Sequence, residues 1–502
     1  DIKKKIKVEK NFLNYLVKYL SNNKNLIGEM SIENFIVFYK SSNLLYKDYE
    51  IIFNLESSEF DPIIKKKFQN KKNIFNFYSN LFKIHIFKRF LFLIKSLIYL
   101  FKIRDYKNYD NKNICLMDSY EINNPKFFLS DKYIYDQTLA IKYKSRERGN
   151  EIIDINHYIT IKNYLSLLLD IFKNYNFFQR NQLISYLNII FNYEKNIFLT
   201  FFKKNNIKIF LSSFIVQPYV SSAVAAIEQL NGRSIGYTMS YIEDYNSHLN
   251  IDAFNYFFSF NNSRYKKLNN SNLIEIFSLG YINDYKFKEK KNSSIELKEK
   301  LLKTGAKYII GFYDQGSSDD NMFEIGHNPS RVGYEFLLNK IIHDKNFALI
   351  IKPKKPAMLK NKLGEIYNLL IKAKETKRCI VLDNIDFHET KNLEDIPAKI
   401  AMASDLTIHD TLLAGTAGLE SAMTGTKSVF FDYYNATKSQ FDKENLKIVF
   451  RDWNYLWNEI SKDLKSGNNN LGNWKDIIDN FDNFRDGKTN IRIMEFLKKV
   501  IE

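Results

Sequence analysis

A turn of small residues that follows a buried strand is the part of this sequence best suited to bind a ligand. The apolar run Asp405–Ile408 predicts the strand, and helix-like spacing over Thr416–Thr424 predicts a helix directly after the turn. A second apolar run, Ser428–Phe431, completes a strand–helix–strand unit. Open parallel sheets bind ligands at the carboxyl ends of their strands, where this turn would lie. Small side chains and the N–H groups of a helix start suit an anion, and the turn consists of Gly415, Thr416, Ala417 and Gly418.

Glu420 is the first charged residue after the turn and lies about one turn into the predicted helix. A capping box would place the acid three residues after Thr416, but that residue is Leu419. On the rim of a binding site, the carboxylate could accept two hydrogen bonds from a ribose diol while the turn faces the phosphates. The alternative is a solvated glutamate on an ordinary helix surface. Because no buried partner is evident, we expect Glu420→Ala to weaken nucleotide binding and to leave the fold intact.

Three further segments supply candidates for phosphate binding. Lys352 and Pro353 end a predicted strand, where the lysine could place a fixed positive charge on a departing phosphate. A long polar loop after another predicted strand could wrap a phosphate, although a solvated surface loop explains its composition equally well. Histidines in two predicted loops could bind a phosphate or a donor carboxylate, or could simply be solvated. The loop candidates are Gly316, Ser317 and Ser318, and the histidines are His327 and His409.

The acid–base residue of a transfer reaction is expected in the first half of the chain. Asp118 and the pair Glu243 and Asp244 each follow the end of a predicted strand, where a carboxylate can face a cleft and exchange a proton with a substrate. No pattern matches a metal site, because the 7 histidines do not pair at ligand spacing and the pair Asp319-Asp320 lies in the polar loop. We therefore expect neither a metal nor a cofactor.

The net charge of the chain is strongly positive, which bears on its partners. The 502 residues carry a formal charge of +17, which would attract a nucleic acid, an acidic lipid surface or a phosphorylated substrate. The lysines are spread along the chain, and no helix-turn-helix, zinc-finger or RNA-recognition signature is present, so we expect no nucleic-acid partner. The two cysteines, Cys115 and Cys379, fit a reducing cytoplasm, where we expect the protein to be located.

The segment Leu81–Arg104 is apolar but is interrupted by lysines and arginines. A membrane span needs about 20 mostly uncharged residues, so this segment does not predict one. It predicts either an amphipathic helix lying on an anionic membrane surface or a helix packed on its own domain with its lysines reaching solvent. In the first case, the protein would attach peripherally to the inner face of the cytoplasmic membrane.

Alternating strands and helices predict an α/β protein with two Rossmann-like domains. Residues 1–285 form the first domain, which begins with extra helices. Residues 286–303 are charged and poor in core residues, which predicts a linker. The alternation restarts at Lys307 and predicts a second domain over residues 304–486. A C-terminal helix, residues 487–502, is expected to pack back onto the first domain.

This arrangement resembles the GT-B glycosyltransferase fold, in which two Rossmann-like domains face each other across a cleft. The Lys352-Pro353 pair after a strand, followed by GTAGLE and SVFFDYY, is similar to bacterial surface-polysaccharide glycosyltransferases. It most resembles those that use CMP-activated acidic sugars, such as Kdo and sialic acid enzymes, and the capsule proteins named for a PFTS motif. The basic-Pro pair of these families is often His-Pro, and only Thr416 represents the hydroxyl pair of their second motif.

The resemblance implies a metal-independent glycosyltransferase. Its donor would be a nucleotide sugar, with a CMP-sugar favoured, held by the second domain. Its acceptor, on the first domain, would be a lipid-linked or growing glycan of the bacterial surface, such as capsule, O-antigen or lipooligosaccharide. Two other enzymes stay open, namely a polyol-phosphate transferase of the teichoic-acid type that uses a CDP-polyol, and a nucleotide-sugar epimerase. Outside enzymes, a non-catalytic partner in polysaccharide assembly and a nucleic-acid-binding protein are the alternatives.

Overall fold

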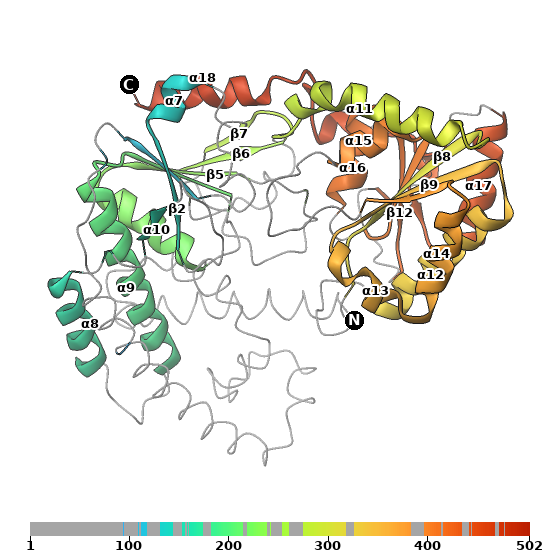
Figure 1. The fold of residues 1–502 in the computed structure, drawn as a ribbon. Coiled ribbons are helices and arrows are strands. Elements are labelled where there is room, and N and C mark those ends of the chain that lie inside the picture. Colours follow the sequence, from blue (N-terminus) through green and yellow to red (C-terminus); the bar gives the residue numbers. More distant parts are fainter. Residues whose placement is uncertain are drawn as a thin grey trace, which may run out of the picture. The chain divides into compact units, whose positions relative to one another are not determined.

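The computed structural model of the chain contains two compact units, both visible in Figure 1. Unit 1 comprises Asp1–Thr238, Tyr245–Phe277 and Ile493–Glu502, and unit 2 comprises Met239–Asp244 and Ser278–Arg492. The structure describes residues 94, 109, 112–117, 131–143, 153–155, 158, 160–173, 182–213, 218–237, 241, 254–260, 275–317, 326–382, 396–412, 415–433, 441–442, 444–466, 471–475 and 477–501.

Unit 1 is built on a seven-stranded sheet in the order β3-β2-β1-β4-β5-β6-β7. Neighbouring strands from β3 to β6 are parallel, and the strand order reverses between β1 and β4, as in doubly wound α/β sheets. The strands are β1 (Ile114–Met117), β2 (Thr138–Lys142), β3 (Ile153–Asp154), β4 (Ile209–Ser212), β5 (Arg233–Tyr237), β6 (Tyr256–Ser259) and β7 (Glu275–Ser278). The helices are α7 (Lys132–Asp136), α8 (Ile161–Lys173), α9 (Gln182–Lys204) and α10 (Pro218–Gln229).

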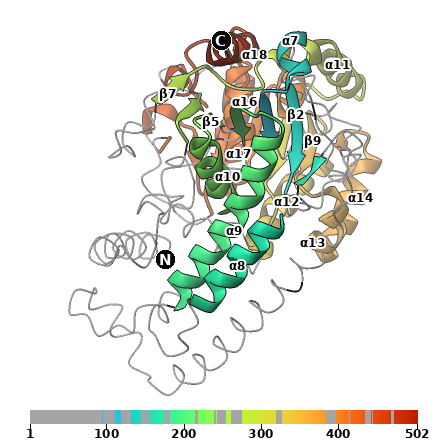
Figure 2. The ribbon, with the colours of Figure 1, turned by 90° about the vertical axis from the view of Figure 1, so that its left-hand side faces the viewer.

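Aromatic side chains of α9 form much of the core of unit 1. Phe198 and Phe202 lie four residues apart, hence on one face of the helix, and their ring centroids are 6.3 and 5.8 Å from that of Phe210 on β4. Helices α8 and α9 lie side by side (Figure 2), and Asn163 Nδ2 donates a hydrogen bond to Thr200 Oγ1 at 2.9 Å. Burial of such rings is the main stabilising contribution that this sequence offers the sheet.

Unit 2 contains a six-stranded sheet in the order β10-β9-β8-β11-β12-β13, and every pair of neighbouring strands is parallel. Here the strand order reverses between β8 and β11. The strands are β8 (Tyr308–Asp314), β9 (Phe347–Pro353), β10 (Cys379–Val381), β11 (Leu406–His409), β12 (Lys427–Phe431) and β13 (Val449–Phe450). The helices are α11 (Tyr285–Leu302), α12 (His327–His343), α13 (Leu359–Leu363), α14 (Tyr367–Glu375), α15 (Pro397–Ala403), α16 (Thr416–Met423), α17 (Trp453–Ser466) and α18 (Thr489–Ile501), with 3₁₀ turns at Pro356–Met358, Gly364–Ile366, Glu444–Leu446 and Ile478–Asn480.

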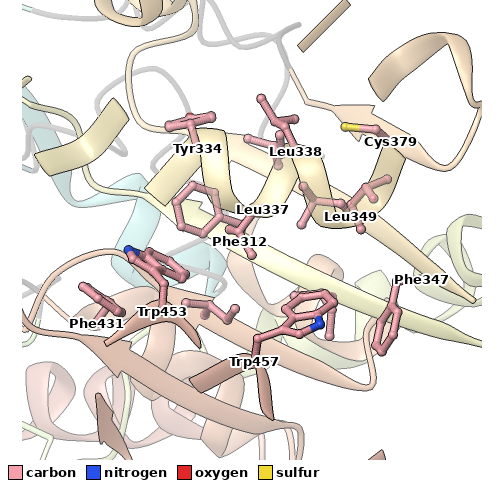
Figure 3. Packing of buried hydrophobic residues seen from close by; sticks show 14 of the residues in the cluster. Phe312, Tyr334, Leu337, Leu338, Phe347, Leu349, Cys379, Phe431, Trp453 and Trp457 are labelled. Carbon is pink, nitrogen blue, oxygen red and sulfur yellow. The ribbon is translucent and has the colours of Figure 1, made fainter. Parts of the chain in front are cut away.

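Helices cover both faces of this sheet. On one face, α12, α13, α14 and α17 bury a large cluster of aliphatic and aromatic side chains. Figure 3 shows part of this cluster, in which the rings of Phe431 and Trp453 stack at a centroid distance of 4.1 Å and an interplanar angle of 10°. On the other face, α11, α15 and α16 bury a smaller cluster around Tyr313 and Ile350. Unit 2 is therefore a three-layered α/β sandwich.

Helix α18 contributes to both units. Its first turn lies in unit 2, where Thr489 Oγ1 and Arg492 Nε donate hydrogen bonds of 3.0 and 2.8 Å to the carbonyl of Leu279. Its remainder lies in unit 1, where the ring of Phe496 packs 4.7 Å from that of Phe277. Lys498 also forms an ion pair with Asp131 there.

The prediction of two parallel α/β domains is confirmed, and individual elements differ from expectation. The stretch expected as a linker, residues 286–303, is almost entirely the helix α11, because Leu297 and Leu301 lie on one face and pack against α15. The segment Tyr133–Tyr135 belongs to the short helix α7, and the strand beside it is β2. The basic segment Leu81–Arg104 lies outside the described residues except for Ile94. Within the described ranges, no helix is both long enough and apolar enough to cross a bilayer.

Gly333 offers a test of the packing in unit 2. An added Cβ there would lie 2.7 Å from Trp453 Cζ2 and closer still to Tyr433 Oη. Overpacking of a core costs about 1–3 kcal/mol, whereas Gly→Ala in a helix gains only about 1 kcal/mol. We therefore expect Gly333→Ala to lower the thermal denaturation midpoint, while Glu335→Ala, at an exposed position of the same helix, changes it little. An unchanged or raised midpoint in Gly333→Ala would contradict this packing.

Candidate functional site

Four side chains form a row across the carboxyl edge of the unit 2 sheet. The register pairs Lys352 of β9 with Tyr313 of β8, Tyr313 with His409 of β11, and His409 with Phe430 of β12. Register partners point to the same face of a sheet, so this row faces α15 and α16. The rings confirm it, because the centroid of His409 is 6.1 Å from that of Tyr313 and 5.7 Å from that of Phe430. The row crosses the point where the strand order reverses, which is where open α/β sheets bind ligands.

The structure brings Lys352 and Glu420 within electrostatic range of each other. Burial raises the pKa of the Glu420 carboxyl, and hydrogen bonds and the charges of Lys286 and Lys352 act in the opposite direction. Lys352 is partly buried at the end of β9, and the neighbouring Pro353 is buried. The two segments expected to bracket a nucleotide, the end of β9 and the turn into α16, therefore do lie on one face of one sheet.

The expectation that Glu420 is a rim carboxylate without a buried partner is wrong. The residue is only 3% exposed, and both of its oxygens accept hydrogen bonds. Tyr281 Oη donates to one oxygen at 2.6 Å, and the backbone N–H of Ala398 donates to the other at 2.6 Å. Ala398 follows Pro397, the first residue of α15, so Glu420 caps the start of α15 rather than its own helix. Its partners lie 22 and 139 residues away in the sequence, where a local pattern cannot reveal them.

Packing explains the glycines of the turn before α16, whereas from the sequence we attributed its small residues to the approach of a ligand. A Cβ at Gly415 or Gly418 would lie 2.5 or 2.6 Å from the ring of Phe430, so packing requires both glycines. Thr416 Oγ1 accepts a hydrogen bond of 2.8 Å from the N–H of Tyr241. Ala417 packs against the core of this face. The N-cap residue of α16 is Gly415, which has no side chain to form a capping hydrogen bond, so the first N–H groups of this helix suit an anion.

His409 is not a loop residue, because it is the last residue of β11 and is 1% exposed. Burial lowers the pKa of the imidazole to about 4, so the ring is neutral at neutral pH. Its Nδ1 donates to the carbonyl of Thr411 at 2.8 Å. A buried neutral ring cannot supply the positive charge that we considered for a phosphate or a carboxylate.

The loop after β8 is held by the side chains of two aspartates. The N–H of Gly316 donates to Asp314 Oδ1 at 2.6 Å, and the N–H of Gln315 donates to Asp410 Oδ1 at 2.8 Å. Ser317 Oγ lies 2.6 Å from His327 Nδ1 in a hydrogen bond. These groups are engaged in hydrogen bonds within the protein, so the structure gives the expected phosphate loop no support.

Sequence reasoning missed a buried polar cluster at this edge. Asp314 ends β8 and forms an ion pair with Lys362, and it accepts a hydrogen bond of 2.7 Å from Tyr334 Oη. Asp410 follows β11 and is completely buried. The position of both acids at the ends of apolar strands could have revealed them. The same criterion selects the acid–base candidates in the first half of the chain.

The remaining candidates lie outside the described residues, so the structure does not place them. They are Asp118, Glu243, Asp244 and Ser318, together with the pair Asp319-Asp320. Within the described part of the chain, no group of three or more His, Cys, Asp or Glu side chains could hold a metal ion.

No protein-family model matches the sequence, and no curated protein matches it. Among solved structures, the chain is similar to the wall teichoic acid polymerase TagF, with 14% identity and a TM-score of 0.43 over 82% of this chain and 97% of that one. It is also similar to the UDP-GlcNAc 2-epimerase from Methanocaldococcus jannaschii, with 13% identity and a TM-score of 0.45 over 77% and 99% of the chains. A third similarity is to Anabaena HepE in complex with UDP and glucose, with 11% identity and a TM-score of 0.41 over 77% and 100%. Similarity this distant carries no argument about activity, so function has to be argued from the residues of this chain.

Proposed function

We propose that the chain is a nucleotide-sugar-dependent glycosyltransferase of the GT-B type, whose donor binds at the carboxyl edge of the unit 2 sheet. The observation that carries this proposal is the placement of Lys352 on the sheet face that α16 covers, within electrostatic range of Glu420. A lysine on the face of a sheet that a helix start also faces is an arrangement suited to phosphate, and the N-cap of α16 is Gly415, which has no capping side chain. The site adjoins the reversal of strand order, where nucleotides bind in open α/β sheets.

The phosphates are best assigned to the side of β9 and α16 rather than to the loop after β8. The N–H groups of Gln315 and Gly316 already donate to aspartate side chains, whereas the N-cap of α16 is Gly415, which has no side chain to accept from the helix N–H groups. His409 is neutral and buried, so we assign the charge that meets the phosphate to Lys352. A phosphate between Lys352 and the turn Gly415–Gly418 would meet both a charge and backbone donors.

Glu420 supports this site by connecting the elements that surround it. Its carboxylate joins α16 to the start of α15 through Ala398 and to Tyr281. A ribose diol would have to share these occupied oxygens, each of which retains one lone-pair direction. We therefore assign Glu420 first to positioning the turn, and a direct bond to the ribose is a second role that binding measurements can separate.

In the proposed reaction, an acceptor hydroxyl replaces the nucleotide phosphate at the anomeric carbon of the sugar. Negative charge develops on the departing phosphate oxygen, and Lys352 and the α16 N–H groups would stabilise it without a metal ion. A general base has to take the proton of the acceptor hydroxyl. Asp118, Glu243 and Asp244 remain the candidates for this role.

The donor and the acceptor follow from the sequence resemblance. The Lys352-Pro353 pair and the GTAGLE turn favour a CMP-sugar as donor, and a bacterial surface glycan or a lipid-linked acceptor. A CDP-polyol would present the same phosphates and ribose to the site, so a transferase that moves a polyol phosphate is the second candidate. Attachment to an anionic membrane through Leu81–Arg104 would bring the enzyme to a lipid-linked acceptor at the inner face of the membrane.

Binding of nucleotides tests the proposal directly. We expect one class among CMP-, CDP-, UDP- and GDP-linked compounds to raise the thermal midpoint, since a ligand at 100 times its dissociation constant stabilises by about 2.7 kcal/mol. CMP-sugars and CDP-polyols are the arms that separate the two candidate reactions. If no nucleotide in the panel shifts the midpoint or binds in calorimetry, the proposed function is wrong.

Lys352→Ala should lower turnover more than it lowers donor affinity. The lysine interacts most strongly with the phosphate as that group departs, so its loss affects the transition state more than the ground state. Losing one such charge should reduce kcat by about 100-fold. Lys355→Ala, at an exposed lysine three residues along the chain, is the matched control and should leave kcat near that of the wild type. Equal kinetics for the two variants would remove Lys352 from the reaction.

Variants of Glu420 should distinguish a structural role of its carboxyl group from direct contact with the nucleotide. Glu420→Ala leaves the N–H of Ala398 and the hydroxyl of Tyr281 without an acceptor, which costs about 1–3 kcal/mol for each buried group. Glu420→Gln keeps an acceptor for Ala398, and its amide can donate to the Tyr281 oxygen, so it should largely restore the thermal midpoint. If Glu420→Gln is stable but binds nucleotide more weakly than the wild type, the carboxylate also contacts the ligand. A midpoint of Glu420→Ala equal to that of the wild type would contradict the burial described here.

A further inference from the structure

Two buried aspartates lie next to each other at the end of the unit 2 sheet. Asp314 is the last residue of β8, and Asp410 follows the last residue of β11. The register pairs Tyr313 with His409, and the N–H of Asp410 donates to the carbonyl of Tyr313 at 3.1 Å. Asp314 and Asp410 are thus neighbours on adjacent strands, on the face that α12 covers.

The two carboxyl groups receive very different numbers of donors. Asp314 accepts hydrogen bonds from the N–H of Gly316 at 2.6 Å and from Tyr334 Oη at 2.7 Å, and it pairs with Lys362. Asp410 Oδ1 accepts one bond of 2.8 Å, from the N–H of Gln315. Asp410 Oδ2 is buried and has no hydrogen-bond partner among the described residues.

The charges around the pair do not balance two carboxylates. Lys362, on α13, forms an ion pair with Asp314. Lys354, which follows β9, also acts on Asp410, and its charge is a smaller influence there than that of Lys362. The other titratable groups that face the pair are the phenols Tyr334 on α12 and Tyr433 after β12, and the imidazole His409 on β11. None of these supplies a second positive charge, because phenols have no cationic form and His409 is neutral.

We propose that Asp410 is held as the neutral carboxylic acid at neutral pH, so that Asp314, Asp410 and Lys362 together form a buried cluster without net charge beneath the carboxyl edge of the sheet. Two adjacent carboxyl groups that share a buried site do not readily both ionise when the ion pair and most of the hydrogen-bond donors belong to one of them. The proton stays on Asp410 because Asp314 has the donors and the lysine. The Asp410 hydroxyl then occupies the position of the otherwise unpartnered oxygen.

The electrostatics of the site agree with this assignment. Burial, with the charge of Asp314 as the next contribution, raises the pKa of Asp410 to about 8. The folded chain therefore binds one more proton than the unfolded chain between about pH 4 and pH 8. The corresponding stabilisation is fully present below the unfolded pKa and is lost as the pH rises through the folded pKa.

The neutral cluster also bears on the nucleotide site, and this step rests on the proposed function. The cluster lies one residue beyond the row that contains Lys352, at the edge where the phosphates would bind. A second carboxylate there would weaken the attraction between this edge and a phosphate. When Asp410 is protonated, it carries no negative charge that would weaken the attraction of Lys352 for the phosphate. Asp410 is then a positioning residue, which acts through the loop after β8 and through the field, without touching the substrate.

Infrared spectroscopy of the wild type and of Asp410→Asn tests the proton directly. We expect a C=O stretching band of a protonated carboxylic acid at pH 7 in the wild type, and its loss in the difference spectrum against Asp410→Asn. Asparagine mimics the neutral acid in shape, so this variant should fold. Asp314→Asn is the matched control and should be destabilised, because it leaves Lys362 buried without its ion pair. Absence of the acid band at pH 7 would overturn the proposal, and this readout on the wild type holds even where a variant fails to fold.

The pH dependence of stability gives an independent readout that needs no ligand. For one linked proton, the folding equilibrium of Asp410→Asn should improve relative to the wild type by about tenfold per pH unit up to about pH 8, then level off. Parallel melting profiles of the two proteins from pH 5 to pH 9 would overturn the proposal. A third arm follows binding of a CMP-sugar or CDP-glycerol, whose phosphodiester charge is constant over this range. Wild-type affinity should fall severalfold above pH 8, and that of Asp410→Asn should stay flat. If neither compound binds at any pH, the proposed function fails, while the first two readouts still decide the protonation of Asp410.

Discussion

Strand β8 pairs with β9 on one side and with β11 on the other, and the geometry of the unit 2 site depends on this double pairing. Successive side chains of a strand point to opposite faces, so Tyr313 faces α15 and α16 while Asp314 faces α12. A slip of one residue would exchange these two faces. It would bring the carboxylate of Asp314 under α16, close to Lys352, and would put the ring of Tyr313 beside Lys362. The register alone therefore separates the positive part of this edge from its acidic part.

Burial then decides how the polar groups of this edge can be used. Glu420 and Asp314 are both almost inaccessible, and each oxygen of these carboxylates accepts at least one hydrogen bond. Leaving one such group unpaired costs about 1–3 kcal/mol, against a net stability of about 5–15 kcal/mol for an ordinary domain. A ligand that displaced these contacts would therefore lose a large part of its binding free energy. We therefore assign the phosphates to the start of α16 and to Lys352, on the opposite face of the sheet from the Asp314 carboxylate.

The strands and the order of the elements could be predicted from the sequence because they leave local signals. Apolar runs such as Phe347–Lys352 mark buried strands, and their alternation with helices predicts a parallel sheet. The pairing of Glu420 with Tyr281 joins residues 139 positions apart, so no window of the sequence contains it. The glycines of the turn into α16 were identified correctly as special, but their reason, the ring of Phe430, lies on the next strand. The shortest elements are the hardest to predict, because α7 spans 5 residues and β13 spans 2, too few to show a hydrophobic period.

The negative charge of a buried acid is limited in a different way on each face of the sheet edge. On the face of α12, the negative charge of Asp314 is compensated by contact, through Lys362 and Tyr334. On the face of α16, burial raises the pKa of the Glu420 carboxyl, and hence opposes the ionised form that would cancel the field of Lys352. A carboxyl group whose ionised form is disfavoured opposes the charge of Lys352 less than an exposed carboxylate would. A glutamate within electrostatic range of Lys352 is in this way compatible with an anionic ligand beside it.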